Sequence, residues 1–393
     1  MSDNTTVVIG AGPAGLATAA ELERRGVRAV VLERGDAVGA SWRARYDRLR
    51  LNSSKWFSQL PGARYVRGTA VFPTRGDVVR YLDDYAADRR LDVRCNTRVD
   101  RIDRADSGWV VRTSAGDIEA ANVIVATGYS HTPHIPAWPG RDAFEGRLLH
   151  AAEYGNARPF AGADVLVAGS GCSGMEIAYE LAAEGAQRVR LAVRTSPNIL
   201  IRSPLNPVLG RMLGKLPAKR ADAVMRAVQR RRIGDLTEYG LPMPEEGVAS
   251  RLRRLGVAPA IVDRPTIEAI KDGRVEIVAG VAAMDAHGVE LADGSRLELD
   301  AVIAATGYRT GLDAMVGHLG VLDERGVPRA LREEAPPGLR FVGYIVRPGQ
   351  IGGMGEEARS AAAAVAGAAP RAPKPRRGAV LYPAPRPQAA AGR

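Results

Sequence analysis

Two glycine-rich segments of the 393-residue chain have the residue types and spacing that bind a nucleotide pyrophosphate. The first, Gly10-Ala11-Gly12-Pro13-Ala14-Gly15, follows the pattern G-x-G-x-x-G. In this pattern the first glycine permits a tight turn. The second lets the backbone approach a pyrophosphate, and the third lets a helix pack on a strand. Glu33 ends the next apolar run about 20 residues on, where an acid accepts hydrogen bonds from ribose hydroxyls.

The second segment, Gly169-Ser170-Gly171-Cys172-Ser173-Gly174, repeats the pattern without the acid. The apolar run that follows it ends in Arg194-Thr195-Ser196. A cation and hydroxyl groups suit the 2′-phosphate of NADPH, which a carboxylate would repel. The second site is therefore predicted to prefer NADPH over NADH. The alternative is that Arg194 is an ordinary surface arginine.

Both segments need a strand before them and a helix after them. Apolar runs predict these elements around the first segment at 6–9, 14–25 and 27–32, and around the second at 164–168, 173–184 and 188–193. Two further runs, Val123–Tyr129 and Val302–Tyr308, each lead into Ala-Thr-Gly-Tyr. The repeats predict an α/β protein with two dinucleotide-binding, Rossmann-like domains.

Four other segments complete the expected organisation. Residues 211–232 read as a basic helix interrupted at Pro217, and residues 275–299 as an antiparallel β layer with a turn at Asp293-Gly294. Phe341–Tyr344 is expected to be a final strand, and Gly349–Gly355 to lead into a helix at Glu356–Val365. The segment Pro370–Arg393 is rich in Pro, Ala and Arg, which predicts a disordered tail.

Charge and composition exclude several classes of protein. The net charge is +11, but residues 211–232 hold eight basic residues and one acid, and the tail holds six basic residues and no acid. The remainder is close to neutral, so no nucleic-acid partner is expected. No apolar run is long enough to span a membrane, and no secretory leader precedes the first strand. We therefore expect no transmembrane segment and a cytoplasmic location.

The cysteines exclude two further kinds of chemistry. Cys95 and Cys172 form neither a C-x-x-C pair nor a metal-ligand cluster, so neither dithiol chemistry nor a metal site is expected. Cys172 is interpreted as a small apolar filler of its turn. With dithiol reductases set aside, a flavin plus a nicotinamide would explain two nucleotide sites in one chain.

A third motif stands just before the second glycine segment. Phe144, Gly146, His150 and Tyr154 fit F-x-G-x-x-x-H-x-x-x-Y, which resembles the fingerprint of the class B flavin-containing monooxygenases. Gly39 to Trp42 resembles that family's G-x-x-W, and Leu51 to Lys55 its N-S-x-K stretch. Three stretches resemble the plant-type indole-3-pyruvate monooxygenase branch: 46–51, 173–176 and 300–308. The resemblance runs from about residue 5 to about residue 365.

The domain arrangement is expected to be an insertion. The FAD domain would comprise residues 1–158 and 299–369. The NADPH domain would be inserted at 159–298, with antiparallel β layers, and the tail would occupy 370–393. A homodimer is left open.

The resemblance also implies the site residues. Those expected at FAD are Gly10, Gly12, Pro13, Ala14, Gly15, Glu33, Arg34, Ser41, Trp42, Asn52, Ser53, Val99, Thr127 and Gln350. Those expected at NADPH are Leu51, Gly169, Gly171, Cys172, Ser173, Gly174, Met175, Arg194, Thr195 and Ser196. Asn52 is the expected catalytic residue, because its amide can donate to oxygen bound on the flavin or hold the nicotinamide ribose. The alternative for Asn52 is a turn-capping residue.

The resemblance implies that NADPH reduces FAD, and that oxygen adds at flavin C4a to form a (hydro)peroxyflavin. One oxygen atom then passes to a small organic substrate: an amine, a thioether or an aryl-pyruvate. The alternatives are a Baeyer–Villiger monooxygenase, whose related motif usually ends in Trp or Asp where this chain has Tyr154, and an oxidase or flavin reductase that releases peroxide. His150 is either a switch between domains or a hydrogen-bonded structural histidine, and Tyr154 is expected to be a packing residue.

Overall fold

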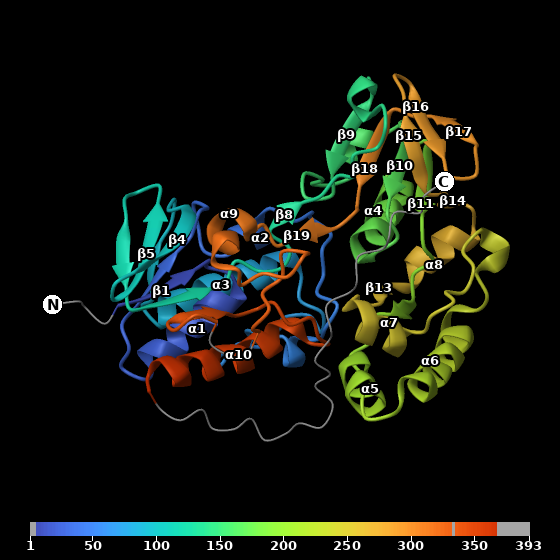
Figure 1. The fold of residues 1–393 in the computed structure, drawn as a ribbon. Helices are drawn as coiled ribbons and strands as arrows, with labels where there is room; N and C mark the ends of the chain where they lie inside the picture. Colours follow the sequence, from blue (N-terminus) through green and yellow to red (C-terminus); the bar gives the residue numbers. More distant parts are fainter. Residues whose placement is uncertain (1–4, 332–334, 368–393) are drawn as a thin grey trace.

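The computed structural model describes residues 5–331 and 335–367, which form two lobes (Figure 1). Within these residues each lobe is built on a five-stranded parallel sheet. We call the part built on the first sheet the first unit, and the part built on the second sheet the second unit. The first sheet has the order β20-β7-β1-β2-β3, with strands Leu339–Phe341, Asn122–Val125, Thr6–Ile9, Ala29–Leu32 and Asp92–Arg94. The second has the order β14-β11-β10-β18-β9, with strands Glu276–Ala279, Arg188–Val193, Asp164–Ala168, Ala301–Ala304 and Arg147–His150.

The two strand–helix–strand repeats expected from the sequence are confirmed. In the first unit, α1 (Pro13–Glu23) joins β1 to β2, and in the second, α4 (Cys172–Ala183) joins β10 to β11. Every residue of β1 and β2 is buried, as continuous apolar strands covered on both faces must be. The predicted α/β fold class with two Rossmann-like parallel sheets is therefore confirmed.

The two sheets also have equivalent arrangements around their central strands. Strand β1 lies between β2 and β7, and β10 lies between β11 and β18. The two Ala-Thr-Gly-Tyr sequences follow β7 and β18, so they occupy equivalent places. Strands β9 and β18 pair in the second sheet but fall outside the expected range 159–298. We therefore propose residues 147–304 as the second unit.

An antiparallel layer covers one face of each parallel sheet. In the first unit it comprises β4 (Val99–Ala105), β5 (Gly108–Thr113) and β6 (Ile118–Ala120). In the second it comprises β15 (Val281–Met284), β16 (Gly288–Leu291) and β17 (Arg296–Glu298). Gly294 makes the expected turn between β16 and β17, with a φ of +83° that favours glycine.

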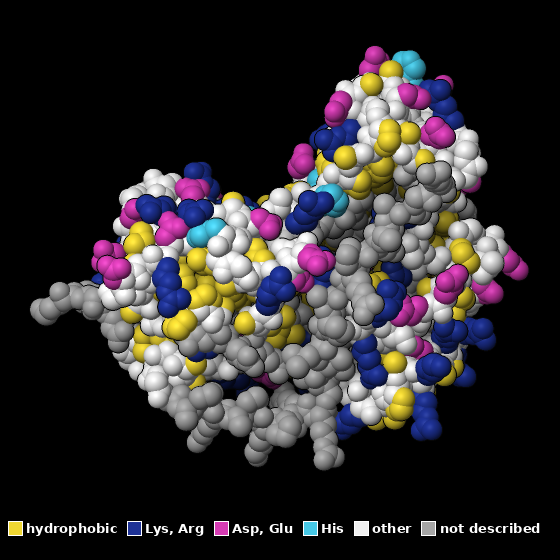
Figure 2. Space-filling model, in the orientation of Figure 1, with side chains coloured by type: hydrophobic (Ala, Val, Ile, Leu, Met, Phe, Trp, Pro, Cys, Tyr) yellow, Lys and Arg dark blue, Asp and Glu magenta, His cyan; other side chains and the backbone are white. Residues whose placement is uncertain are grey.

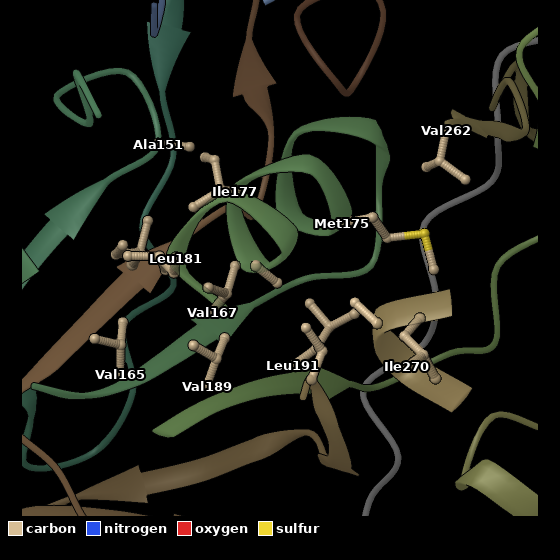
Figure 3. Packing of buried hydrophobic residues seen from close by; sticks show 14 of the residues in the cluster. Ala151, Val165, Val167, Met175, Ile177, Leu181, Val189, Leu191, Val262 and Ile270 are labelled. Atoms are coloured by element: carbon tan, nitrogen blue, oxygen red, sulfur yellow. The ribbon is translucent and has the colours of Figure 1, made fainter. Parts of the chain in front are cut away.

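Helices cover the other face of each sheet. Around the first sheet, α1 packs against α3 (Arg75–Asp88) and α10 (Gln350–Val365). In the second unit, α4 packs on β10 and β11, and strand residues such as Val167 and Leu191 meet Ile177 and Leu181 of that helix (Figure 3). Each unit therefore has its own hydrophobic core.

The chain between β11 and β14 adds smaller elements to the second unit. They are β12 (Ile199–Ile201), α5 (Asn206–Leu213), α6 (Ala218–Ile233), α7 (Val248–Leu255), β13 (Ala260–Val262) and α8 (Arg264–Lys271). The basic helical segment is interrupted at Pro217, as expected, because proline lacks the N–H that a continuous helix needs. Strands β12 and β13 pair in parallel at one end of α4.

The C-terminal helix begins earlier than expected. Helix α10 starts at Gln350, six residues before Glu356, and its first two turns contain the glycines. A Cβ at Gly352 would lie 2.6 Å from the carbonyl oxygen of Phe57, and one at Gly355 would lie 2.8 Å from Pro61. Close packing of the helix on the first unit therefore overrides the low helix propensity of glycine. The final strand is Leu339–Phe341 instead of Phe341–Tyr344, and the expected tail lies outside the described residues.

Two connections join the units. The chain passes through β8 (Thr132–Pro133) on its way to the second unit and through β19 (Tyr308–Arg309) on its way back. These short strands pair in antiparallel fashion, with Tyr308 opposite Pro133. Both crossings therefore lie at one place between the lobes (Figure 1). The described residues also include two short α-helices, α2 (Ala40–Arg43) and α9 (Asp313–Val316). They include several 3₁₀ turns as well, of which η1 spans Lys55–Phe57.

Candidate functional site

The first glycine turn has the geometry that its sequence predicts. Gly10 has a φ of +103°, and a Cβ there would lie 2.9 Å from the carbonyl oxygen of Ala126. A Cβ at Gly15 would lie 1.8 Å from the carbonyl oxygen of Gly10, so the helix could not pack. A Cβ at Gly12 would meet no atom of the described chain within 4 Å. Two glycines therefore serve the fold, and Gly12 leaves space above the turn.

The second glycine turn repeats this division of roles. Gly169 has a φ of +116°, and a Cβ there would lie 2.5 Å from the carbonyl oxygen of Ala305. A Cβ at Gly174 would lie 1.8 Å from the carbonyl oxygen of Gly169. At Gly171 no atom of residues 5–331 or 335–367 lies within 4 Å of the added Cβ.

Both turns fit a pyrophosphate. Helices α1 and α4 begin after Gly12 and Gly171, and in the described part of the chain neither glycine position is capped by a side chain. The helix-start amides and the helix dipole are thus directed at the open space above each turn. The residues present fit one dinucleotide at each turn.

Glu33 stands at the edge of the first turn. Its carboxylate accepts hydrogen bonds from the backbone N–H groups of Ala11, at 2.8 Å, and Gly35, at 2.9 Å. A carboxylate has about four acceptor positions, so two remain for ribose hydroxyls. Glu33 is therefore fixed by the turn itself and fits its expected role. Arg34, the next residue, is exposed.

The corresponding place in the second unit holds a cation. Arg194 and Thr195 are exposed at the end of β11. Among the described residues Arg194 has no ion-pair partner. The stem of its side chain lies close to Gly280, where an added Cβ would be 3.1 Å from the Arg194 Cβ. An unpaired guanidinium at this position fits a 2′-phosphate. Ser196 lies beside it, and its carbonyl accepts from Arg251 at 3.0 Å.

Two other expected contacts lie at the same edge of the first sheet. The N–H of Gly39 donates to the carbonyl of Ala11 at 3.0 Å, which places Ser41 and Trp42 of α2 near the first turn. The hydroxyl of Thr127 lies 2.7 Å from that of Tyr344, next to the loop before α10. These residues thus surround the carboxyl ends of the parallel strands, where α/β proteins bind their ligands.

Other expected residues are used within the protein. Val99, Leu51 and Met175 lie in hydrophobic cores, and Figure 3 shows Met175 packed with Val262 and Ile270. Gln350 bonds its own loop: its Oε1 accepts from the N–H of Arg347 and its Nε2 donates to the carbonyl of Ile345. The Ser53 hydroxyl lies 2.9 Å from that of Ser58. Contacts of these residues with a cofactor stay a prediction.

The F-x-G part of the third motif has a steric reason. A Cβ at Gly146 would lie 2.4 Å from the ring of Phe144 and 2.8 Å from the carbonyl oxygen of Asp300. Tyr154 is fully buried, with its ring centroid 6.3 Å from that of Tyr46 and 5.9 Å from that of Phe160. Tyr154 therefore has the packing contacts expected of it.

His150 is bonded on both ring nitrogens. Its Nδ1 accepts from the N–H of Ala152 at 3.0 Å, so the proton of the neutral ring is assigned to Nε2, which donates to the carbonyl of Gly307 at 2.9 Å. Burial lowers the pKa of His150, which favours this neutral form. The geometry fits the hydrogen-bonded structural interpretation, and the bond joins the second unit to its return connection.

Asn52 reaches across the boundary between the units. Its Nδ2 donates to the sulfur of Cys172 at 3.3 Å, at the first residue of α4. The same sulfur accepts from the N–H of Ile261 at 3.3 Å, and burial raises the pKa of the thiol. Asn52, which is expected at FAD, is thus in contact with Cys172, which is expected at NADPH.

Arg202, Glu176, Tyr46 and Asp263 are functional candidates that the sequence did not single out for a role. Arg202 donates to Asn52 Oδ1 at 3.2 Å, to Asp263 Oδ2 at 2.6 Å and to Glu176 Oε1, and the Tyr46 hydroxyl donates to Glu176 Oε2 at 2.6 Å. We call Tyr46, Asn52, Glu176, Arg202 and Asp263 the inter-unit cluster. Arg202 is one of fifty arginines, so its type gave no signal.

In residues 5–331 and 335–367 no helix is both long enough and apolar enough to cross a membrane. In the same residues no group of three or more His, Cys, Asp or Glu side chains is placed to hold a metal ion.

The chain is similar to known oxidoreductases. The family model described as pyridine nucleotide-disulphide oxidoreductase matches residues 7–233. An indole-3-pyruvate monooxygenase of Oryza sativa subsp. japonica, YUCCA1, is 34% identical over 87% of this chain and 86% of its own length. A probable indole-3-pyruvate monooxygenase of Arabidopsis thaliana, YUCCA9, is 35% identical over 83% of this chain and 80% of its own length.

A solved structure agrees with these relatives. The flavin-containing monooxygenase from Stenotrophomonas maltophilia superposes with a TM-score of 0.71 and is 26% identical, covering 93% of this chain and 99% of its own length.

Proposed function

Because this chain belongs to the class B flavin-containing monooxygenases, we propose that it uses FAD and NADPH to transfer one atom of dioxygen to an aryl-pyruvate. The observation that carries the proposal is the pair of matching open glycine turns with opposite charges beside them. Glu33 lies beside the first turn and Arg194 beside the second.

The charges support one assignment of the cofactors. Glu33 suits a ribose with free hydroxyls, so FAD would occupy the first turn. Arg194, Thr195 and Ser196 suit a phosphorylated ribose, so NADPH would occupy the second. When bound, the flavin supplies oxygen activation and the nicotinamide supplies the electrons.

Asn52 would act where the units meet. Its amide nitrogen faces the start of α4, where the second cofactor would approach the first. One of its two N–H groups is directed at the Cys172 sulfur, a weak acceptor, which leaves it able to bind a better one. Asn52 would therefore orient groups of the bound cofactors by donating hydrogen bonds. The neighbouring Glu176 and Arg202 are buried, and their low-dielectric surroundings would strengthen those bonds.

The relatives support the substrate class. Two plant proteins that match most of this chain are named for indole-3-pyruvate, an aryl-pyruvate. With such a substrate the balance is aryl-pyruvate, NADPH, a proton and dioxygen in, and aryl-acetate, carbon dioxide, NADP⁺ and water out.

The test is a labelling experiment on the purified holoenzyme. Indole-3-pyruvate and NADPH are supplied under isotopically labelled dioxygen, and the products are analysed by mass spectrometry. The expected result is one labelled oxygen in the new carboxylate and one carbon dioxide released per product. An amine and a thioether serve as comparison substrates. NADPH consumption with stoichiometric hydrogen peroxide and no labelled product from any substrate would overturn the proposal.

A further inference from the structure

Arg202 bonds to the first unit although it belongs to the second. We propose that Arg202 is a positioning residue that holds the Asn52 amide in one orientation and fixes it against the start of α4. The inference rests on the proposed function, because it concerns how the cofactor-facing Asn52 is set.

The orientation of Asn52 follows from the chemistry of arginine. A guanidinium has only hydrogen-bond donors, so the Asn52 atom that faces it must be Oδ1. The NH₂ group of Asn52 is then turned toward Cys172 and the start of α4. If the amide were flipped, two donors would face each other. Arg202 thus decides which end of the amide faces the cofactor space.

Arg202 is itself held in place by its strand. It follows β12, and Asp263 follows the paired strand β13, so the register that matches Ile201 with Val262 puts the two side chains next to each other. The N–H of Arg202 donates to the carbonyl of Val262 at 2.8 Å, and one nitrogen of its guanidinium donates to Asp263 at 2.6 Å. The guanidinium is therefore presented from a fixed backbone.

Glu176 completes the site from helix α4. It is buried and paired with Arg202, whose side chain is 3% exposed. Its other oxygen accepts from the Tyr46 hydroxyl at 2.6 Å. Tyr46 and Asn52 both come from the first unit, so one buried ion pair of the second unit binds the first unit at two points. Removing one partner of such a pair would leave a buried charge, which is strongly destabilising.

Replacing Arg202 by lysine can distinguish a positioning role from a purely structural one, because the two side chains carry the same charge and differ in shape. A lysine at position 202 would keep the charge next to Glu176. Its single ammonium could not replace the planar fork that reaches Glu176, Asn52 and Asp263 together. Arg202→Lys should therefore keep the ion pair but lose the hold on Asn52.

A matched control exists in the same unit. Arg190 on β11 is also buried, with 5% of its side chain exposed, and it pairs with Asp164 and Glu276, both of the second unit. Arg190→Lys makes the same chemical change at a comparable depth without touching the first unit.

The experiment measures hydrogen–deuterium exchange and the peroxide released per NADPH in the holoenzyme. Arg202→Lys should raise exchange in residues 49–55 roughly tenfold, the factor expected for losing one charge-assisted hydrogen bond. It should also raise the peroxide fraction severalfold, while Arg190→Lys changes neither. Unchanged exchange in residues 49–55 overturns the hold on Asn52, and an unchanged peroxide fraction overturns the positioning role.

Variants at Asn52 test the same bond from the other side. Asn52→Asp keeps an acceptor for Arg202 but has no amide donor, whereas Asn52→Ala loses both. Exchange at residues 199–203 should therefore rise with Asn52→Ala and stay at the wild-type level with Asn52→Asp, while both raise the peroxide fraction. Equal exchange in the two variants would overturn the inference. If the wild type oxidises no NADPH, the proposed function fails. The exchange comparison would still test whether Arg202 holds the Asn52 amide.

Discussion

Glu180 is an acid on the buried face of helix α4, with 2% of the residue exposed. Burial raises its pKa to about 7, and the nearby Glu184 adds to the shift. In the unfolded chain the carboxyl has its ordinary pKa of 4.5. The folded state therefore favours the protonated form. This contribution to stability is complete below about pH 4.5 and is lost as the pH rises through about 7.

Glu180→Gln should remove this pH dependence. Glutamine keeps the shape of the protonated acid, so at pH 8 we expect the variant to be more stable than the wild type by on the order of 2–3 kcal/mol, and near pH 4.5 about equally stable. Denaturant unfolding of both proteins at several pH values measures the difference. If the difference in stability between the two proteins did not change with pH, the pKa of Glu180 would be the same in the folded and unfolded states, and burial would not raise it.

Arg194 gives a prediction about the nicotinamide cofactor. Arg194→Ala should lower kcat/KM for NADPH at least tenfold, because a charge-assisted bond to the 2′-phosphate is lost, and should change kcat/KM for NADH little. Steady-state kinetics with the two cofactors makes the comparison. Arg188→Ala, at the exposed opposite end of β11, is the control. Equal losses for both cofactors would mean that Arg194 does not contact the phosphate.

At the residue scale the sequence revealed backbone requirements better than side-chain partners. The glycines of each turn could be assigned because their roles depend on local backbone geometry and on one neighbouring strand. Apart from Asn52, the inter-unit cluster could not be assigned, because its residues come from four separate stretches of the chain, at 46–52, 176, 202 and 263, that only the tertiary structure brings together. Arg202 and Glu176 also have no special spacing in the sequence.

At the element scale, the two glycine turns allow a paired test. Gly12→Ala and Gly171→Ala add one methyl group where the described chain leaves space, so neither should destabilise the apoprotein. The first should reduce FAD content on purification, and the second should weaken NADP⁺ binding at least tenfold with FAD content unchanged.

Flavin absorbance and calorimetric titration with NADP⁺ measure the two effects. Gly155→Ala is the control for handling, because it also adds a methyl group where no atom of the described chain lies within 4 Å and its φ is not positive. Loss of FAD from Gly171→Ala would reverse the assignment of the turns.

Strands with continuous apolar runs were predicted with the correct bounds, whereas the glycine-rich C-terminal helix was not. Strands β1, β10 and β11 have the bounds read from their apolar runs. Helix α10 was placed six residues late, because its glycines are selected by contacts with Phe57 and Pro61 and not by helix propensity. The extent of the second unit depends on which sheet β9 and β18 join, and strand pairing over such distances leaves no local pattern.

At the scale of the whole molecule, His150 ties the second unit to the connection that leaves it. His150→Leu removes the bonds to Gly307 and Ala152, so we expect a loss of stability of about 1–3 kcal/mol and faster hydrogen exchange at residues 305–309. Thermal unfolding and exchange mass spectrometry measure the two effects. If exchange at 305–309 is unchanged, the bond to Gly307 does not restrain the connection.

The net charge is also a property of the whole molecule. Basic side chains gather over α5 and α6, on one corner of the second unit (Figure 2), while the face of the first unit in the same view carries both signs. The sequence had placed much of the excess charge in this segment. The positive charge of this flavin-dependent monooxygenase is therefore local, and its overall value says little about the chemistry.

The pairing of β8 with β19 brings the two connections of the second unit together, since Pro133 lies opposite Tyr308. The second unit can thus be regarded as one very long loop between β7 and α9 of the first unit, whose two crossings are already paired by backbone hydrogen bonds. Because the two crossings lie side by side, a short turn would be long enough to connect Pro133 to Tyr308 directly. The first unit therefore remains a continuous fold on either side of a single crossing point.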